Sequence, residues 1–567
     1  MKNLYRSLAA VLLLAGAGNA AAQQKATGPL QAAQSIALGE HTMLAGTIAL
    51  PNHNTVLLLT DAVSFDITAQ CLAPDGHTVW KTGLNRFQRA VATHVGLLDM
   101  RDIAIGQAAR DNKQLQKDKL AASLYPTNVF SDGNSVVFAE RLDEDAFKKV
   151  NKDKSLKDGQ MYVQRLDEQG RLTQHLFDPR PAPDSKKTEA ITLGRYAEPN
   201  GYAEVVRETN KREETLVFCT MHYDLTTKTV QRTPLELPVT PEPITGMSRF
   251  RHWYQEWAYL GHRPNQTYFC RRTLVTGAPK EKPGDRPIIY QVHIADDQGG
   301  LAGGFSTTLG LNKGTRVMYS GWMPNPGEMN HIPNYYTVSQ NKSYVTYDEW
   351  NTSSGATGAF YLDYRTGDVL IYGEYGEGDL PDPTEADLLG FFERRYSTDG
   401  KVLAQVQGPY SEAMRAKKKK LSFKGYYYRS TRFHYDPISG QSQFSFAPLR
   451  VYGNSEDFDL FMDKDLKPLR YEYLPGKDKD ERTYTSVIYA QPFKLATTFN
   501  STDDVRLYEH AAKDDHPLYA ALEKQRRAAP ADAPDYWFHL CPTGSASGLV
   551  VEQKRPLGGS LQVYTFQ

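Results

Sequence analysis

The stretch YLDYRTGDVLIYGEY, residues 361–375, decides the fold class of this 567-residue chain. An apolar run ends at Asp363, an Arg-Thr-Gly-Asp segment follows shortly after, and a second apolar run begins at Val369. An aspartate side chain accepts hydrogen bonds from the backbone two residues further on, and glycine adopts the positive φ of tight turns. The stretch therefore predicts two antiparallel strands joined by a tight turn.

Looser versions of this pattern recur along the chain, which predicts an array of such hairpins. Several of the strands are apolar on both faces, for example those that begin at Val56, Ser135, Leu216 and Val369. A strand with one solvated face should alternate apolar and polar residues, so these strands belong to sheets that are covered on both sides. The aspartates that mark the predicted turns are Asp75, Asp167, Asp224, Asp363, Asp399, Asp436 and Asp463.

Hairpins of one kind in sheets covered on both faces predict an all-β fold, a β-propeller-like array. Blades of about 40–50 residues would give roughly six to eight of them, with small helical inserts such as residues 516–528. These turns resemble those of bacterial secreted β-propeller-like proteins in general, and the resemblance implies the fold without a specific family. The alternative architecture is a pair of β-sandwich or half-propeller domains that divide near residue 280.

The N-terminus predicts export from the cytoplasm. Lys2 and Arg6 precede an apolar run at residues 8–17, and small residues follow at positions 20–22. This is the pattern of a secretory signal peptide, and the run is too short to span a bilayer as a helix. We expect a signal peptide at residues 1–22 and a single domain at residues 23–567, periplasmic or secreted, with no transmembrane segment in the mature chain.

Charge and cysteine content narrow the possible partners. The chain has 66 basic and 66 acidic side chains and a net charge of +0, which argues against a nucleic-acid partner because phosphate binding needs clustered excess Lys and Arg. An exported protein can form disulfides, and a bridge from Cys71 to Cys541 would tie the first hairpins to the last strands. The alternative is that Cys71, Cys219, Cys270 and Cys541 are all buried free thiols.

The chain lacks the usual signatures of catalytic and cofactor sites. It contains no HExxH zinc motif, no phosphate-binding GxxxxGK[ST] loop and no G-x-S-x-G nucleophile elbow. The acidic run around Glu377, Asp379 and Asp382 does not have the ligand spacing of a calcium loop. We therefore expect neither a cofactor nor a metal site, and the sequence names no catalytic residue.

Two aromatic segments are the candidates for a ligand site. The segment 250–262 carries Trp253 and Trp257 beside Arg and Glu residues, a combination that suits sugars because rings stack on apolar C–H faces. The irregular segment 321–337 contains three prolines, and long loops of this type often carry function. Plain packing of these residues is the alternative. The full candidate set is Trp253, Trp257, Trp322, His331, Tyr335, Tyr336 and Trp350.

Two functions fit these observations. The first is an exported non-catalytic envelope or secreted protein that binds a protein or glycan partner through loops on one propeller face. The second is a secreted polysaccharide-active hydrolase or lyase that gathers carboxylates and aromatics at the propeller centre. A glycosidase of this kind would need two carboxyl groups about 5–9.5 Å apart. The missing catalytic motifs favour the first function.

Overall fold

Every regular element that the structure describes is a β-strand, as the sequence predicts. The computed structural model describes residues 31–61, 66–85, 129–142, 155–178, 188–210, 215–238, 257–274, 288–308, 315–318, 360–363, 366–377, 387–409, 429–435, 442–448, 457–474, 484–490, 493–499, 505–508, 537–542, 548–553 and 558–566. Within these ranges the strands form eight antiparallel sheets, which we number I to VIII.

The first four sheets follow one another along the chain, each a four-stranded meander. Sheet I contains β2 (Thr42–Ala49), β3 (Thr55–Asp61), β4 (Ile67–Leu72) and β5 (Thr78–Leu84). Sheet II contains β6 (Val129–Asp132), β7 (Ser135–Arg141), β8 (Met161–Leu166) and β9 (Leu172–Phe177). Sheet III contains β10 (Thr188–Glu198), β11 (Gly201–Asn210), β12 (Thr215–Asp224) and β13 (Thr229–Leu235). Sheet IV contains β14 (Ala258–Arg263), β15 (Gln266–Leu274), β16 (Ile288–Asp296) and β17 (Leu301–Thr308).

The remaining sheets include one that joins the two ends of the chain. Sheet V contains β18 (Thr315–Met318), β19 (Phe360–Leu362), β20 (Val369–Glu377), β21 (Asp387–Tyr396) and β22 (Val402–Pro409). Sheet VI contains β23 (Arg429–Tyr435), β24 (Ser442–Pro448), β25 (Asp457–Met462) and β26 (Pro468–Leu474). Sheet VII contains β27 (Tyr484–Ala490), β28 (Phe493–Phe499) and β29 (Val505–Tyr508). Sheet VIII combines β30 (Trp537–Pro542), β31 (Gly548–Gln553) and β32 (Ser560–Phe566) with β1 (Gln31–Ala37).

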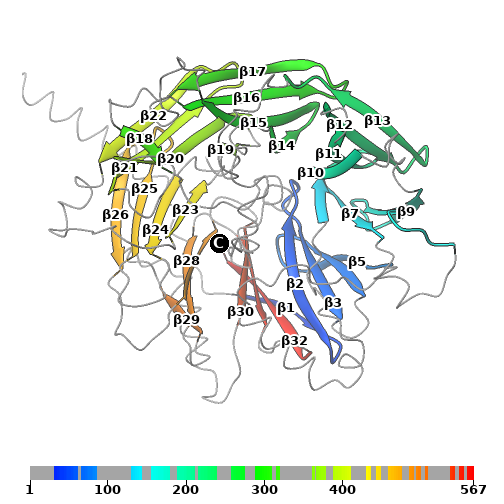
Figure 1. Cartoon of the computed structure of the whole chain (residues 1–567). Helices are drawn as coiled ribbons and strands as arrows, with labels where there is room; N and C mark the ends of the chain where they lie inside the picture. Colours follow the sequence, from blue (N-terminus) through cyan, green and yellow to red (C-terminus); the bar gives the residue numbers. More distant parts are fainter. Residues whose placement is uncertain are drawn as a thin grey trace, which may run out of the picture.

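The sheets are arranged around a common centre in chain order (Figure 1). The first strand of a sheet lies nearest the centre and the last lies at the rim, as β10 and β13 of sheet III show (Figure 1). Inner strands of neighbouring sheets touch, because β10 contacts both β6 and β14. The antiparallel pairing of β1 with β32 places the two ends of the described chain in one sheet. The fold is therefore all-β and propeller-like.

Apolar side chains fill the space between successive sheets. One core cluster joins Val56 and Leu58 of sheet I to Val136 and Phe138 of sheet II, and comparable clusters join sheets II to III, III to IV, IV to V and VIII to I. Successive residues of a strand point to opposite faces, so a strand between two such clusters must be apolar on both. The prediction from the doubly apolar strands is thus confirmed for β3 and β7.

The predicted aspartate turns form within the described residues. Asp363 lies in the turn between the inner strands β19 and β20, and the other turns join the outer two strands of a sheet, at Asp75, Asp167, Asp224, Asp399 and Asp463. The Asp167 carboxylate accepts hydrogen bonds from the backbone N–H groups of Gln169 and Arg171, both at 2.9 Å. Asp463 bonds its own turn in the same way, and Asp224 accepts two neighbouring N–H groups. Asp296, which was not among the predicted turn residues, makes an equivalent turn. Asp436 lies outside the described residues.

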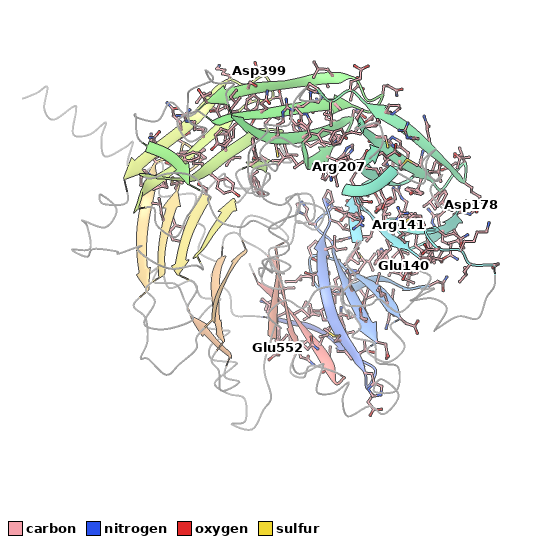
Figure 2. The ribbon with its side chains drawn as sticks, viewed as in Figure 1. Glu140, Arg141, Asp178, Arg207, Asp399 and Glu552 are labelled. Carbon is pink, nitrogen blue, oxygen red and sulfur yellow. The ribbon has the colours of Figure 1, made fainter. Side chains whose placement is uncertain are left out.

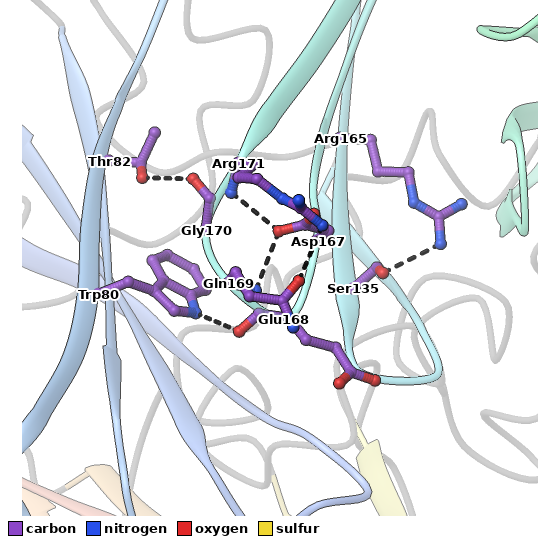
Figure 3. A network of polar contacts seen from close by, with 9 residues as sticks. All are labelled: Trp80, Thr82, Ser135, Arg165, Asp167, Glu168, Gln169, Gly170 and Arg171. Carbon is purple, nitrogen blue, oxygen red and sulfur yellow. Dashed lines mark hydrogen bonds and ion pairs between the residues drawn. The ribbon is translucent and has the colours of Figure 1, made fainter.

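Four of the outer turns also dock a sheet onto the one before it. Figure 3 shows the Asp167 turn of sheet II against β5 of sheet I, where the Trp80 indole N–H donates to the carbonyl of Glu168 at 3.0 Å. The Thr82 hydroxyl donates to the carbonyl of Gly170 at 2.7 Å. A glycine lies in close contact with the preceding rim in four such turns: Gly76 beside Ala33, Gly170 beside Trp80, Gly299 beside Pro234 and Gly400 beside Phe305.

Replacing Gly170 by alanine is expected to destabilise the fold by roughly 2–4 kcal/mol. Its φ is +73° and an added Cβ would lie 2.6 Å from the Trp80 ring, so backbone strain and overpacking act together. Gly133→Ala is the matched control, because Gly133 has a φ of +51° with open space around its Cβ position, and only about 1 kcal/mol of strain is expected. Calorimetric melting compares the two; equal losses would contradict the docking role of the turn.

The structure also bears on the expected domain division, the cysteines and the predicted helical segments. A division into two domains near residue 280 is wrong, since β15 and β16 lie on either side of it and pair in one sheet. Cys71, Cys219 and Cys270 are buried free thiols, so the bridge from Cys71 to Cys541 does not form. Residues 1–22 and the helical insert at 516–528 lie outside the described residues. Among the residues that are described, no helix could span a membrane.

Candidate ligand-binding face

Because each sheet is a meander, the connections between its strands lie alternately at its two ends. In sheets I to IV, the first strand joins the second, and the third joins the fourth, through turns such as 133–134, 199–200 and 264–265. The other connections leave from the opposite end, because neighbouring strands are antiparallel. That end carries the long connections 85–128, 142–160, 236–257 and 275–287. We call the two ends the short-turn face and the long-connection face.

Hydrogen bonds between sheets show that the short turns of neighbouring sheets lie on the same face. The backbone N–H of Asn52 in sheet I donates to the Asn134 side chain in sheet II at 2.9 Å. Arg165 donates to the carbonyl of Glu198, beside the first turn of sheet III, at 3.0 Å. The Arg263 guanidinium reaches the Thr366 carbonyl in the turn of sheet V at 3.2 Å. The long connections of these sheets therefore share the other face.

The innermost strand position of sheet V is divided by a long insertion. β18 and β19 both pair with β20: Met318 pairs with Glu374, and Phe360 pairs with Ile371. Only Tyr372 and Gly373 of β20 lie between these two pairs. The segment 319–359 therefore leaves and rejoins the inner edge of the sheet at adjacent points. This segment carries Trp322, His331, Tyr335, Tyr336 and Trp350.

The structure places one of the seven predicted ligand residues. Trp253 and the five residues of the segment 319–359 lie outside the described residues. Trp257 precedes β14 and is only 4% exposed. Its indole N–H donates to the carbonyl of Pro238 at 2.9 Å, and the Arg271 guanidinium lies 4.2 Å from its ring centroid. Trp257 thus packs between sheets III and IV, and a role in ligand binding stays a prediction.

Two further polar side chains surround Trp257. Arg271 donates to the side-chain oxygen of Gln291 at 2.6 Å, and burial lowers its pKa to about 10. The ring of His293 meets the indole edge-on at 5.7 Å and is 6% exposed. Burial, and then the charge of Arg271, lower the pKa of His293, so this histidine is neutral at pH 7. Arg271 and His293 could not be found from the sequence, because they lie on β15 and β16, away from Trp257 along the chain.

A second polar cluster lies between sheets II and III, where Figure 2 labels Arg141. The Glu204 carboxylate is fully buried and is bonded by Arg141. The hydroxyls of Tyr202 and Tyr223 donate to it at 3.3 and 3.4 Å, and the Nε of Arg195 lies 3.6 Å away. Burial, the largest single effect, acts to lower the pKa of Arg141, but the charge of Glu204 and the contacts with Tyr223 and Tyr202 together raise it. No sequence pattern pointed to this cluster.

A third cluster lies between sheets III and IV on the short-turn face. The Nδ1 of His222 bonds the Glu198 carboxylate at 2.7 Å. Burial, and then the charge of Glu198, raise the pKa of the neighbouring Asp297 carboxyl. The rings of Tyr196 and His262 stack beside them with centroids 3.6 Å apart. A carboxylate that orients a histidine next to a second carboxyl is an arrangement used in acid–base chemistry.

A buried carboxyl also lies between sheets V and VI. Glu393 on β21 is fully buried and accepts a hydrogen bond from the Ser442 hydroxyl of β24 at 2.7 Å. No partner for its second oxygen, Oε1, lies among the described residues. Burial raises the pKa of Glu393 to about 8, against the opposing effects of Ser442 and Arg395. Glu393 is therefore mostly protonated at neutral pH.

Across the described ranges, no three His, Cys, Asp or Glu side chains could hold a metal ion.

Comparison with known proteins finds only distant structural similarities. No protein-family model and no curated protein matches the chain. A solved polysaccharide lyase, Uly1, is 8% identical with a TM-score of 0.30, over 78% of this chain and 89% of its own. The β-propeller domain of the Trilobed protease from Pyrococcus furiosus is 10% identical with a TM-score of 0.29, over 85% and 98%.

Prolyl oligopeptidase B from Galerina marginata is 7% identical with a TM-score of 0.29. The match covers 81% of this chain but only 46% of the oligopeptidase, so this chain spans less than half of that protein. At these identities and TM-scores, the activities of the three proteins cannot be attributed to this chain. The class that can be stated is an all-β protein on a propeller-like scaffold.

Proposed function

We propose that this protein is an exported, non-catalytic binding protein, built as one eight-bladed β-propeller, that holds a protein or glycan ligand on its long-connection face. The eight sheets would be the blades, and the shared sheet VIII would join the first blade to the last. The signal-peptide pattern at residues 1–22 supports a periplasmic or secreted location. A native protein that still begins at Met1 would contradict export.

The insertion in the inner strand of sheet V carries this proposal. Five of the seven aromatic or histidine candidates belong to the segment 319–359, whose two ends lie at the inner edge of the sheet array. The pairing of β18 and β19 with β20 does not depend on this segment. Loops on rigid scaffolds are where binding residues concentrate, and ring faces suit both sugars and protein side chains. The insertion is therefore the natural place for ligand contacts.

The register of sheet V allows the proposal to be tested by deleting the insertion. Replacing residues 319–359 by a Thr-Val pair would put one residue opposite Tyr372 and one opposite Gly373, and would join β18 to β19 as one strand. We expect this variant to melt like the parent and to lose at least 90% of ligand retention. The measurement is the capture of envelope glycans and proteins on the immobilised mature chain.

A second variant controls for the general effect of shortening a connection. The segment 179–187 joins β9 to β10 on the same face and carries none of the seven candidates. Shortening it to a glycine-serine linker is expected to leave retention unchanged. If the mature chain retains no glycan and no protein, or if the excision variant retains as much as the parent, the proposed function is wrong.

A hydrolase or lyase acting on polysaccharide is the second candidate, and the cluster on the short-turn face favours it. Asp297, with its raised pKa, could act as an acid, and His222 held by Glu198 could act as a base. This function predicts that bound polysaccharide is shortened and that Asp297→Asn abolishes the shortening. Retention of an intact polysaccharide by the unaltered protein would exclude it for that ligand.

A further inference from the structure

Two of the long connections are held at their described ends by a buried polar side chain of the following sheet. The connection 85–128 begins at Asn85, directly after sheet I, and Gln164 of sheet II bonds this residue twice. The side-chain oxygen of Gln164 accepts from the Asn85 backbone N–H at 2.9 Å, and its amide donates to the Asn85 carbonyl at 2.7 Å. Gln164 therefore pairs with this backbone as a residue of a neighbouring strand would.

The connection 236–257 is held near both of its ends by Arg271 of sheet IV. The Arg271 guanidinium donates to the carbonyl of Pro238 at 3.2 Å and lies 4.2 Å from the ring centroid of Trp257. The indole N–H of Trp257 donates to the same Pro238 carbonyl at 2.9 Å. The two ends of this connection are therefore bound to one another and to β15.

Arg271 is itself fixed from within sheet IV. Its Nε donates to the Gln291 side chain of β16 at 2.6 Å, and the Gln291 amide donates to the Ser306 hydroxyl of β17 at 2.9 Å. Arg271 is 6% exposed, and burial of a guanidinium group costs free energy that burial of an apolar side chain does not. Packing alone therefore does not require an arginine here. What the arginine adds is a set of donors in fixed directions.

We propose that Arg271 is a positioning residue for ligand binding, which preorganises the long-connection face by fixing Pro238 and Trp257. This inference rests on the proposed function and concerns how that face gains its affinity. A connection that leaves the scaffold from fixed ends loses less conformational entropy when a ligand binds, so the ligand binds more tightly. Gln164 acts in the same way on the connection 85–128, through Asn85.

Arg271→Lys and Arg165→Lys form a matched pair of variants. Arg165 also donates to a carbonyl of the following sheet, that of Glu198 at 3.0 Å, but on the short-turn face. In both variants lysine keeps the charge and removes the rigid guanidinium fork. The probes are the glycan fraction and the protein fraction of a fluorescently labelled envelope extract, each titrated onto the full mature chain.

We expect Arg271→Lys to raise the half-saturating concentration of the retained fraction at least fivefold and to leave the amount bound at saturation unchanged. Arg165→Lys is expected to change neither quantity. A purely structural role would instead lower the amount bound at saturation, because part of the protein would be unfolded. That result, or equal effects of the two variants, would overturn the positioning role and leave the binding protein. A parent that retains neither fraction would overturn the proposed function and this inference together.

Trp257→Phe tests the same claim if Arg271→Lys does not fold. Phenylalanine keeps a ring beneath the guanidinium group and removes only the indole donor to Pro238. We expect this variant to raise the half-saturating concentration about twofold to threefold, less than Arg271→Lys, because Arg271 still bonds the Pro238 carbonyl. Unchanged binding by Trp257→Phe would overturn the inference.

Discussion

Replacing Glu204 by alanine is expected to lower the free energy of unfolding by roughly 3 kcal/mol. The change would leave two guanidinium groups side by side and would remove the acceptor of the Tyr202 and Tyr223 hydroxyls. Breaking a buried ion pair by deleting one member typically costs about 3–5 kcal/mol, and the partial exposure of the arginines places this case at the lower end. Calorimetric melting of the two proteins measures the difference.

Glu208→Ala is the matched control on the same strand. Glu208 bonds Arg232 at 2.9 Å, but the Arg232 side chain is 40% exposed, so the pair is close to a surface ion pair. Such pairs contribute about 0–1 kcal/mol. A loss as large for Glu208→Ala as for Glu204→Ala would show that the buried network between sheets II and III has no special role.

Glu393 is expected to make the stability of the fold depend on pH in the neutral range. Its pKa rises from 4.5 in the unfolded chain to about 8 in the folded protein, so the folded state binds the proton more tightly. Its contribution is fully present below pH 4.5, declines as the pH rises, and is lost above about pH 8. The upper bound of this loss is roughly 5 kcal/mol, at about 1.4 kcal/mol per pH unit.

Glu393→Gln is expected to remove this dependence, because the amide keeps a hydrogen-bond acceptor for Ser442 and never ionises. The variant should melt several degrees above the parent at pH 9 and close to it at pH 5. Asp399→Asn serves as the control: Asp399 is exposed on a turn, and the Ser397 hydroxyl lowers its pKa. That change should have no effect between pH 5 and 9. If the melting temperatures of the parent and of Glu393→Gln change with pH in the same way, Glu393 is not a buried neutral acid.

Local features of the fold could be predicted from the sequence because their causes are local. An aspartate turn depends on the aspartate and the next four residues, which is why Asp167, Asp224 and Asp463 were found from the chain alone. Burial of both faces of β3 and β7 follows from their composition. Asp296 carried a usable signal, the run ADDQGG, that was overlooked.

Features that depend on the assembly of sheets could not be predicted. The pairing of β1 with β32 joins residues from opposite ends of the chain, and no local pattern encodes it. Arg141 and Glu204 meet only because sheet II packs on sheet III. Trp257 was a candidate through its aromatic neighbours in sequence, whereas its partners in space, Arg271 and His293, come from β15 and β16. Such contacts cannot be predicted from a single sequence.

Hydrogen–deuterium exchange on the mature chain, with and without the ligand it retains, tests most directly whether the long-connection face binds that ligand. We expect slower exchange on binding in the segments 236–257 and 319–359 and in the adjoining strands β18 and β19. We expect no change in the short turns 167–171 and 297–300. Protection confined to those short turns would place the ligand on the opposite face and contradict the account.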